Sequence, residues 1–544
     1  MSAATIKPFV ESKLAGDCRP LAIMKVKQRS NAQRRLKMKT PHRPVAVGLL
    51  ILLLSLSTGV REIAIAQSKS VQAAPTDAAL KTRVKKKELA ARLESVIPQL
   101  MKEGDVPGLS VLLIRDGKVF WQRAFGVKNA ETKEPVNDTT VFEAASLSKP
   151  VFAYAVLRLA DSGKLDLDTP LVKYLPGAYV EDDERLNQIT ARMVLSHRTG
   201  FPNWRPRGGA LKIHFTPGEK FSYSGEGFVY LQKVLEHMTG LSLDALMKRT
   251  VFEPLGMTSS SYVWQERYQS LKAFGHNQAG GVTERRQPTE ANAAASLHTT
   301  SADYARFVIA VMNGTGLKRE TARLMLTPQI KVQEGCQNCV NNPGTGRLLP
   351  DTSWGLGWGL QQTLDGDSFW HWGDSNNDVQ CYVVAYPKQK LGIIIFTDSG
   401  NGHSIIPRII NEAIGGRQPA LAWLSYESYD SPARQLLKDI LARGEAAITN
   451  YRERSRDAAD ALDERQINRL GYQLLQRQKV KEAIAVFKWN VERFPESFNV
   501  YDSLGEAYMI SGDKELAIKN YQKSVELNPQ NENGIEILKK LQGK

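Results

Sequence analysis

The chain has 544 residues, of which 42% are hydrophobic and 24% are charged. At roughly 100 to 200 residues per domain this length allows two to four domains, and the composition excludes a small disulfide scaffold and a mostly disordered or fibrous chain. The formal net charge of +15 is uneven: residues 1–66 hold 12 Lys and Arg against 3 Asp and Glu, which leaves 60 against 54 in the remainder. Because the body has no basic stripe with interleaved aromatic residues, we expect no nucleic-acid partner.

The basic N-terminal segment precedes one apolar run, residues 45–60, whose 16 residues fall short of the roughly 20 that a membrane span needs. Ala64-Ile65-Ala66 follows with the small-x-small pattern of a signal-peptide cleavage site. We therefore expect residues 1–66 to be a leader and signal peptide, with Met38 as an alternative start. The rest of the chain is expected to be exported, periplasmic or extracellular. An uncleaved N-terminal membrane anchor is the alternative.

A long domain is predicted over residues 67–425. Near its start, residues 110–126 form two β-rich runs around Asp116-Gly117, which is a strong signal for a β-hairpin. The following stretch, residues 126–368, is mostly helical in its pattern. This order of elements favours an α+β fold with helices grouped beside one sheet.

Ser146 and Lys149 stand three residues apart at the start of an apolar helical run, VFAYAVLRLA, so they share one face of a helix. A serine hydroxyl needs a base to become a nucleophile, and a desolvated lysine with a lowered pKa can serve. The motif is weak by itself, because Ser511-Gly-Asp-Lys514 repeats the same spacing within a turn. A single serine at a helix start, such as Ser146, is also more often an N-cap than a nucleophile.

The next candidate segment is FSYSGEGFVYLQKVL, in which Tyr223 and Gly225 stand at the start of another helical run. A tyrosine in this position has two interpretations. It can be a buried aromatic residue with a bonded hydroxyl, or it can take part in proton transfer beside Ser146 and Lys149.

Three cysteines remain in the body once Cys18 is removed with the leader. Cys336-Gln-Asn-Cys339 could be half of a zinc site, but no second Cys or His pair at ligand spacing is visible, and the loop is rich in Gly, Asn and Pro. A local loop disulfide is the favoured interpretation, which leaves Cys381 unpaired. The histidines show no H-E-x-x-H or similar spacing, so we expect neither a metal nor any other cofactor.

Three β-rich runs, residues 368–372, 379–386 and 391–397, are typical of an antiparallel meander. His371-Trp372-Gly373 lies on the first of them. The early hairpin and the late meander together predict one antiparallel sheet flanked by helices, with a helical subdomain between them.

The order of Ser146-x-x-Lys149, Tyr223-Ser-Gly and His371-Trp-Gly resembles the serine β-lactamase and penicillin-binding-protein superfamily. The chain is similar to its class C β-lactamase-like branch of esterases, D-amino peptidases and carboxypeptidases. The stretches ITARMVLSHRTGFP, FEPLGMTSSSY and WGLGWGL support the resemblance, which covers residues 89–421.

The resemblance implies roles for individual residues. Ser146 would attack a carbonyl and become acylated, Lys149 would take its proton, and Tyr223 would work with Lys149 as acid and base. The backbone N–H groups of Ser146 and Asp374 would hold the oxyanion. Gly373 would let the substrate backbone lie close against the strand.

Two positions depart from the family pattern. Gly225 stands where the second motif commonly has Asn or Ser, and Glu226 beside it is either a substitute or a solvated charge. His371 replaces the usual lysine, and with a reference pKa of about 6.5 it would be largely neutral at pH 7 and would charge toward acid pH. Efficient β-lactam turnover is therefore less expected than hydrolysis of an ester, an amide or a D-amino-acid peptide.

The last eighty residues contain a 34-residue period that resembles tetratricopeptide repeats. The matched pairs are Gly471 and Gly505, Ala483 and Ala517, Phe487 and Tyr521, and Pro495 and Pro529. We place the repeats at residues 465–544 and a helical linker at residues 426–464, in which Ser431-Pro432 marks a helix start. The repeats are either a groove for a protein partner or a stabilising appendage.

The sequence thus predicts an exported serine hydrolase that acts through an acyl-enzyme on a small-molecule ester or peptide substrate. The rival hypothesis is a catalytically silent penicillin-binding-like module that binds a cell-wall or protein ligand while the repeats recruit a partner. Intact Ser146, Lys149 and Tyr223 favour the enzyme, and Gly225 favours the silent module.

Overall fold

The structure is a computed structural model that describes residues 79–543, except 178, 207–208, 341, 343 and 456–461. The predicted leader, residues 1–66, and the alternative start at Met38 lie outside the described residues. Among the residues that are described, none of the helices is both long and apolar enough to cross a membrane.

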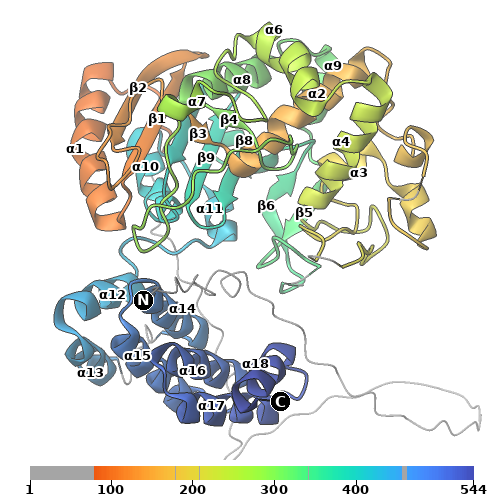
Figure 1. The fold of residues 1–544 in the computed structure, drawn as a ribbon. Helices are drawn as coiled ribbons and strands as arrows, with labels where there is room; N and C mark the ends of the chain where they lie inside the picture. Colours follow the sequence, from red (N-terminus) through yellow and green to blue (C-terminus); the bar gives the residue numbers. More distant parts are fainter. Residues whose placement is uncertain are drawn as a thin grey trace, which may run out of the picture. The chain divides into compact units, whose positions relative to one another are not determined.

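An eight-stranded antiparallel sheet is the centre of the first domain (Figure 1), with the strand order β2-β1-β10-β9-β8-β7-β6-β5. The N-terminal hairpin therefore pairs with the last strand of the C-terminal meander. The strands are β1 (Gly108–Arg115), β2 (Lys118–Gly126), β5 (Ile330–Gln333), β6 (Leu348–Trp354), β7 (Gly359–Thr363), β8 (Gly366–Ser375), β9 (Val379–Tyr386) and β10 (Leu391–Thr397). A separate two-stranded ladder joins β3 (Phe142–Glu143) to β4 (His298–Thr299).

The predicted hairpin and meander are confirmed. β1 and β2 meet at Asp116 and Gly117, whose φ angles of 53° and 70° are those that a tight two-residue hairpin turn requires. Strand β8 pairs with β9, and β9 pairs with β10, all antiparallel.

The expectation that residues 126–368 are mostly helical is wrong in two places. Strands β5, β6 and β7 lie within this stretch, and residues 256–297 contain only the short helix α7 (Tyr268–Leu271). The three strands are short, β6 contains Pro350, and glycines interrupt the chain before β7, so no alternating run marks them. Their pairing onto β8 through β7 decides their conformation.

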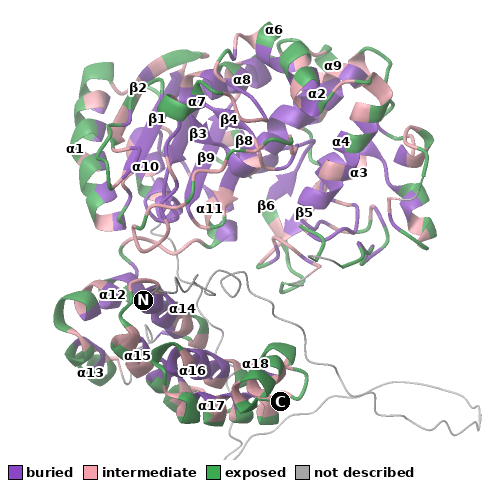
Figure 2. Ribbon diagram, viewed as in Figure 1, coloured by how far each residue is buried: buried purple, intermediate pink, exposed green. Residues whose placement is uncertain are grey.

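The two faces of the sheet pack against two separate cores, because successive side chains of a strand point to opposite faces. On β10, Ile393 and Ile395 join the core formed with α1 (Lys86–Gly104), α10 (Ile406–Ala413) and α11 (Pro419–Leu424). Ile394 and Phe396 join the core formed with α2 (Ser148–Asp161), α4 (Gly225–Thr239) and α8 (Ser301–Asn313). Figure 2 shows this burial concentrated in the strands and in the helix faces that meet them.

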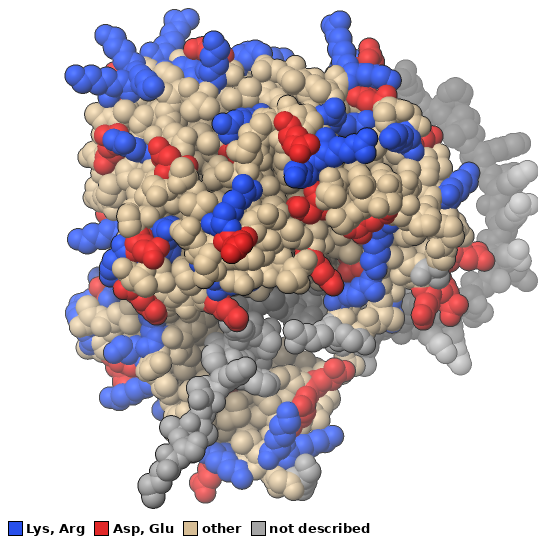
Figure 3. Space-filling view, turned by 45° about the horizontal axis from the view of Figure 1, so that its top comes forward, with Lys and Arg blue, Asp and Glu red and all other residues tan. Residues whose placement is uncertain are grey.

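Short helices complete the subdomain around α2 and α4. They are α3 (Ala191–Leu195), α5 (Leu243–Met247), α6 (Glu253–Leu255) and α9 (Arg319–Met325). On the face drawn in Figure 3, Lys and Arg side chains are interspersed with Asp and Glu side chains, in keeping with the near balance of charge in the body.

The C-terminal region is helical throughout its described residues, with its own hydrophobic core. Its helices are α12 (Pro432–Arg443), α13 (Glu445–Arg454), α14 (Glu464–Gln476), α15 (Val480–Arg493), α16 (Phe498–Ser511), α17 (Lys514–Leu527) and α18 (Glu532–Gln542). Ser431 caps α12 at the position that the sequence predicts. Leu436 and Ile448 of the first two helices belong to the same core as the repeats, so α12 and α13 extend the repeat stack.

The 34-residue period has a packing explanation. A Cβ atom added at Gly471 would lie 2.4 Å from the Phe487 ring, and one added at Gly505 would lie 3.0 Å from the Tyr521 ring. Each glycine thus allows the first helix of a pair to lie directly against an aromatic ring of the second helix. The repeated glycine and aromatic positions are the two halves of one contact.

Candidate active site

Ser146 lies on a short 3₁₀ helix, η2 (Ala145–Leu147), that leads directly into α2. Its Oγ is 3.0 Å from Nζ of Lys149, which donates a hydrogen bond to it, so the side chains predicted to act together are in contact. Ala145, just before Ser146, has a φ of +46°, a conformation that is uncommon for a residue with a side chain. Such local strain is characteristic of sites where the fold holds one side chain in a required direction.

Lys149 is completely buried. Besides Ser146, its Nζ donates to the carbonyl oxygen of Ala294 at 2.9 Å and lies 4.7 Å from the centre of the Tyr223 ring. Within the described residues no carboxylate forms an ion pair with it. Burial therefore lowers the pKa of Lys149 well below its ordinary value, which is what a lysine needs to act as a base near neutral pH.

Tyr223 lies just ahead of α4, and its buried hydroxyl has no hydrogen-bond partner of normal geometry among the described residues. Burial raises the pKa of Tyr223 far above its ordinary value, and the neighbouring Ser146 hydroxyl offsets only part of this effect. The environment thus favours a neutral phenol beside a neutral amine. Of these two groups, Lys149 is the one suited to accept a proton, and Tyr223 is suited to donate or relay one.

His197 is a neighbour of the site that the sequence analysis left unassigned. Its ring stacks on Tyr223 with 4.3 Å between ring centres, and its Nδ1 accepts a hydrogen bond from the Ser224 backbone at 3.0 Å. It therefore positions Tyr223 from both the ring and the backbone. Its place in the stretch LSHRTG, which supports the family resemblance, was the available signal for it.

His371 lies on β8 and is fully buried. Phe369 on the same strand belongs to the core that contains α2, whereas Trp370 and Trp372 belong to the opposite core. Strand alternation thus directs His371 toward the side of Ser146. Its Nδ1 lies 2.7 Å from the Trp372 carbonyl oxygen, so Nδ1 carries the hydrogen and Nε2, which has no partner among the described residues, is an acceptor.

Burial lowers the pKa of His371 to about 3, and the nearby Lys149 acts in the same direction. The imidazole is therefore neutral at pH 7, as the sequence analysis expects. It remains so well below the reference pKa of about 6.5, so the expectation that it charges under mildly acidic conditions is corrected.

The end of β8 closes against the serine helix. A Cβ atom at Gly373 would lie 2.6 Å from the Ala144 carbonyl oxygen and 2.4 Å from the Cys381 sulfur, so only glycine allows this approach. Strand β7 pairs with β8 only as far as Trp370, while β9 continues to Ser375. The last residues of β8, including Asp374, therefore have an edge without a pairing strand in the described chain, where a substrate backbone could lie.

The Asp374 side chain has a structural role of its own. It accepts hydrogen bonds from Gln380 at 2.9 Å and from the Tyr426 hydroxyl at 3.2 Å. Burial raises its pKa, and these donors oppose the effect. Only its backbone N–H is thus available for the predicted role in an oxyanion hole, together with the N–H of Ser146 in the first turn of η2.

Gly225 has a different environment from the one that a substrate-binding residue would have. Its N–H donates to the Asn203 backbone and side-chain oxygens at 3.0 and 2.9 Å. A Cβ atom there would lie 2.6 Å from the indole ring of Trp204, which is 45% exposed. The indole thus occupies the space that a polar side chain at position 225 would need.

Glu226 does not replace the missing polar group. It is buried, pairs with Arg205 and accepts a hydrogen bond from the Tyr179 hydroxyl at 2.7 Å. The Arg205 guanidinium and the Tyr179 hydroxyl oppose burial and hold the pKa of Glu226 below its usual value. This ion pair and the Asn203 contacts fasten the segment that carries Trp204 to the start of α4.

Cys336 and Cys339 form a disulfide, and Cys381 is free and buried, as the favoured interpretation predicts. The Cys381 thiol donates to the Ala144 carbonyl oxygen at 3.2 Å, directly below the serine helix. In the part of the chain that the structure describes, no group of three or more His, Cys, Asp or Glu side chains is arranged to hold a metal ion.

This fold, with a serine and a lysine at a helix start facing a tyrosine and the edge of an antiparallel strand, is that of the β-lactamase-related serine hydrolases. Residues 93–409 match the family described as Beta-lactamase, and the chain belongs to that family. Residues 498–531 match the family described as Tetratricopeptide repeat.

Two relatives illustrate the range of the family. Protein flp of Staphylococcus aureus (strain N315) is 22% identical over 337 residues, which cover 59% of this chain and 64% of that protein. Esterase EstB of Burkholderia gladioli is 30% identical over 209 residues, which cover 33% of this chain and 53% of the esterase. The chain thus spans less than two thirds of the length of either relative.

Solved structures agree on the fold. The octameric penicillin-binding protein homologue from Pyrococcus abyssi has a TM-score of 0.51 and 24% identity, and the match covers 64% of this chain and 82% of that one. A class C β-lactamase has a TM-score of 0.51 and 19% identity, with 62% and 99% covered.

Proposed function

We propose that this protein is an exported serine hydrolase that forms an acyl-enzyme on Ser146 with an ester, amide or D-amino-acid peptide substrate. One observation carries the proposal: a fully buried lysine, Lys149, lies 3.0 Å from Ser146 Oγ without a carboxylate partner among the described residues. A buried, unpaired lysine is costly to a fold, and it is explained when its neutral form has a chemical role.

In the proposed mechanism, Ser146 Oγ attacks the substrate carbonyl while the neutral Lys149 amine takes the hydroxyl proton. The backbone N–H groups of Ser146 and Asp374 hold the oxyanion. Collapse of the tetrahedral intermediate breaks the bond to the leaving group, which receives a proton from Lys149 by way of Tyr223. A water molecule then attacks the acyl carbon and gives a proton to Lys149. Collapse of the second tetrahedral intermediate breaks the bond to Ser146 Oγ, which takes that proton back from Lys149 as the acid is released.

Two neighbours favour an uncharged substrate. His371 presents an unprotonated Nε2 where a lysine would present a cation, so a substrate carboxylate would find no positive partner there. Trp204 presents an apolar ring where a polar side chain would hold an amide. These features support esters and neutral amides over β-lactams, and the name of the relative esterase EstB agrees.

The alternative is a catalytically silent module that binds a cell-wall or protein ligand, and Gly225 is the observation that favours it, because its N–H is already bonded to Asn203. Export is supported by the disulfide, since disulfides persist in oxidising compartments. We further propose that the repeats recruit a protein partner. Deleting residues 465–544 should then remove capture of that partner and leave hydrolysis in place.

Intact-mass spectrometry tests the proposal with a fluorophosphonate probe, a p-nitrophenyl ester and a penicillin. We expect a stoichiometric adduct with the probe and turnover of the ester, with a transient penicillin adduct or none. Ser146→Ala should abolish both the adduct and the turnover while the fold is retained, since it removes one hydroxyl and its hydrogen bond from Lys149, at a cost of about 1 to 3 kcal/mol.

Ser511→Ala is the matched control, because Ser511 belongs to the second S-x-x-K sequence and its hydroxyl only donates to the Tyr508 carbonyl. It should react like the parent. A persistent penicillin adduct would indicate a penicillin-binding carboxypeptidase. Absence of any adduct on folded protein would refute the enzyme in favour of the silent module.

A further inference from the structure

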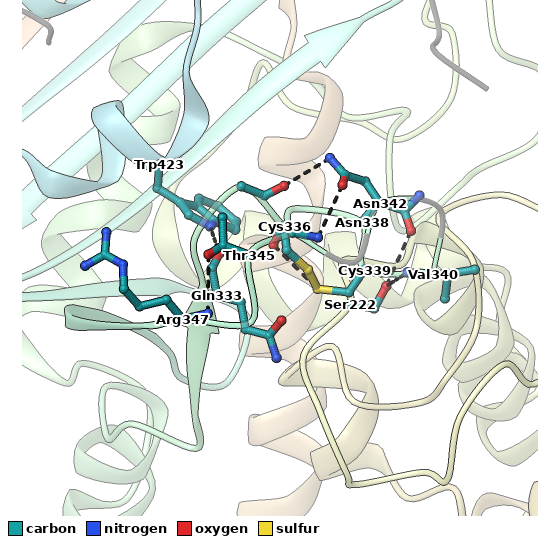
Figure 4. Close-up of a disulfide and its surroundings, with 12 residues drawn as sticks. Ser222, Gln333, Cys336, Asn338, Cys339, Val340, Asn342, Thr345, Arg347 and Trp423 are labelled. Carbon is teal, nitrogen blue, oxygen red and sulfur yellow. Dashed lines mark hydrogen bonds between the residues drawn. A yellow bond between two sulfur atoms is a disulfide. The ribbon is translucent and has the colours of Figure 1, made fainter. Parts of the chain in front are cut away.

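The Cys336–Cys339 disulfide closes a loop against Ser222 (Figure 4), the residue that precedes Tyr223. The cross-link encloses just two residues, Gln337 and Asn338, and each contacts one of these two residues. The Gln337 carbonyl accepts the Tyr223 backbone N–H at 2.9 Å, and the Asn338 side chain accepts the Ser222 hydroxyl at 3.4 Å.

The same loop is held from its other side. The Gln337 side chain donates to the Leu424 carbonyl at 2.9 Å, and Trp423 Nε1 donates to the Gln333 carbonyl at 2.8 Å. On the Ser222 side there is one more contact: Val340, just beyond the cross-link, donates its N–H to Ser222 Oγ at 3.2 Å. The loop therefore bridges helix α11 to the Ser222 hydroxyl and the Tyr223 backbone.

General stabilisation does not account for this disulfide. The entropic effect of a cross-link on the unfolded chain grows with the length of the loop that it closes, and a separation of three residues is close to the minimum. A cross-link this short mainly limits the conformations of the residues inside it. In this chain those residues are the ones that hold the backbone beside Tyr223.

We propose that the Cys336–Cys339 disulfide is a positioning element for Tyr223. It fixes the Gln337 carbonyl, which fixes the Tyr223 backbone, which in turn holds the phenol ring 4.7 Å from Lys149 Nζ. The catalytic consequence rests on the proposed function, whereas the positioning itself does not. The other side of the ring is held by its stack on His197.

The first experiment needs no activity. Hydrogen exchange of peptides that contain Tyr223 is followed by mass spectrometry in the full chain, before and after reduction with a phosphine, and in the Cys336→Ser/Cys339→Ser variant. We expect at least about tenfold faster exchange of these peptides, with no change in peptides from α8. Unchanged exchange around Tyr223 would overturn the inference, whether or not the protein hydrolyses anything.

The second experiment is a double-mutant cycle with Tyr223→Phe, read as the rate of fluorophosphonate acylation. Breaking the disulfide should slow acylation by about tenfold in the parent and by less than about twofold in Tyr223→Phe, because both changes act on one group. In the parent background, loosening the ring should also move the acid limb of the pH profile upward, as Lys149 becomes better solvated.

Gln337→Ala serves as the control, since it removes the anchor to Leu424 and keeps the carbonyl that holds Tyr223. It should slow acylation less than disulfide cleavage does. An equal loss in the parent and Tyr223→Phe backgrounds would refute a role through Tyr223. A parent that never reacts would refute the proposed function, and the exchange result would still decide the positioning.

Discussion

At the scale of residues, the site is defined by groups whose pKa values are moved apart by the same cause. Burial lowers the pKa of Lys149 and raises that of Tyr223, so it favours the neutral form of both groups. His371 is neutral for the same reason and presents an acceptor, Nε2, rather than a charge. The site therefore lacks the permanent cation that usually occupies the third motif, and this absence bears on which substrates fit.

The first prediction concerns the acid limb of activity. The proposed mechanism needs neutral Lys149, so kcat/KM should fall as the pH drops through the lowered pKa of this amine. Since the pKa of His371 is about 3, this histidine does not titrate between pH 5 and 8. In a pH series, His371→Gln should change the rate and leave the midpoint of the acid limb in place. Loss of the limb in that variant would contradict the neutral role of His371.

A second prediction concerns Trp204, whose indole lies over Gly225. Trp204→Ala should reduce kcat/KM for p-nitrophenyl butyrate relative to acetate by about tenfold, the usual size of a lost apolar contact in a pocket. Gly225→Asn should act in the same direction, because its Cβ atom would lie 2.6 Å from the ring and displace it. Steady-state kinetics with the two esters checks this. An unchanged acyl preference in both variants would exclude Trp204 from the substrate site.

At the scale of elements, the alternation of strands and the repeat period perform the same task, which is to present defined side chains to a partner element. On β8, alternation separates His371 from Trp370 and Trp372. In the repeats, glycine and an aromatic residue sixteen positions later form one contact between paired helices. Strand alternation thus prepares a surface for elements distant in the sequence, and the repeat period prepares one for the next helix.

The repeat packing leads to a prediction about Phe487, which is fully buried against Gly471. Phe487→Ala should destabilise the repeat region by about 3 to 5 kcal/mol, because it leaves a cavity in the small core. Differential scanning calorimetry should show one transition moving down while ester hydrolysis at 25 °C is retained. Phe498→Ala is the matched control, since Phe498 is 38% exposed. Loss of hydrolysis in Phe487→Ala alone would mean that the repeats support the active site.

At the scale of the whole molecule, the histidines are distributed unequally between the hydrolase domain and the repeats. Five histidines of the hydrolase domain have pKa values that burial lowers: His197, His214, His298, His371 and His403. His276, which is paired with Asp398, is shifted upward. No histidine follows His403 in the sequence, so the repeats have none.

This distribution predicts that mild acid destabilises the two regions unequally. Below about pH 6.5 the unfolded chain binds protons at these histidines more readily than the folded domain does, so the stability of the domain falls as the pH drops. Each such histidine contributes up to about 1.4 kcal/mol per pH unit. The His276–Asp398 pair acts in the opposite direction and offsets part of the loss.

Calorimetry at pH 7.5 and 5.5 checks the prediction. The hydrolase transition should move to lower temperature more than the repeat transition, which Phe487→Ala identifies independently. Equal shifts of both transitions would show that the buried histidines do not control acid stability.

Much of the fold could be predicted because its signals are local. The Asp116-Gly117 turn, the apolar strands of the meander and the 34-residue period each depend on residues close together in the chain. Strands β5 to β7 could not be predicted, since short segments interrupted by glycine and proline gain their conformation from pairing onto β8. The family motifs likewise marked Ser146 and Lys149, whose contact spans one helical turn.

The amino-acid sequence by itself determined the family, the antiparallel sheet with its helices, the repeats and the order of the candidate catalytic residues, because these rest on motifs and periodicities along the chain. Only the tertiary structure decided that Lys149 is buried with no carboxylate partner among the described residues, that His197 stacks on Tyr223 and that Trp204 covers Gly225. It also placed the Cys336–Cys339 loop against Tyr223, more than a hundred residues away. Burial and long-range contacts depend on which elements meet, and they set the pKa values and the shape of the site.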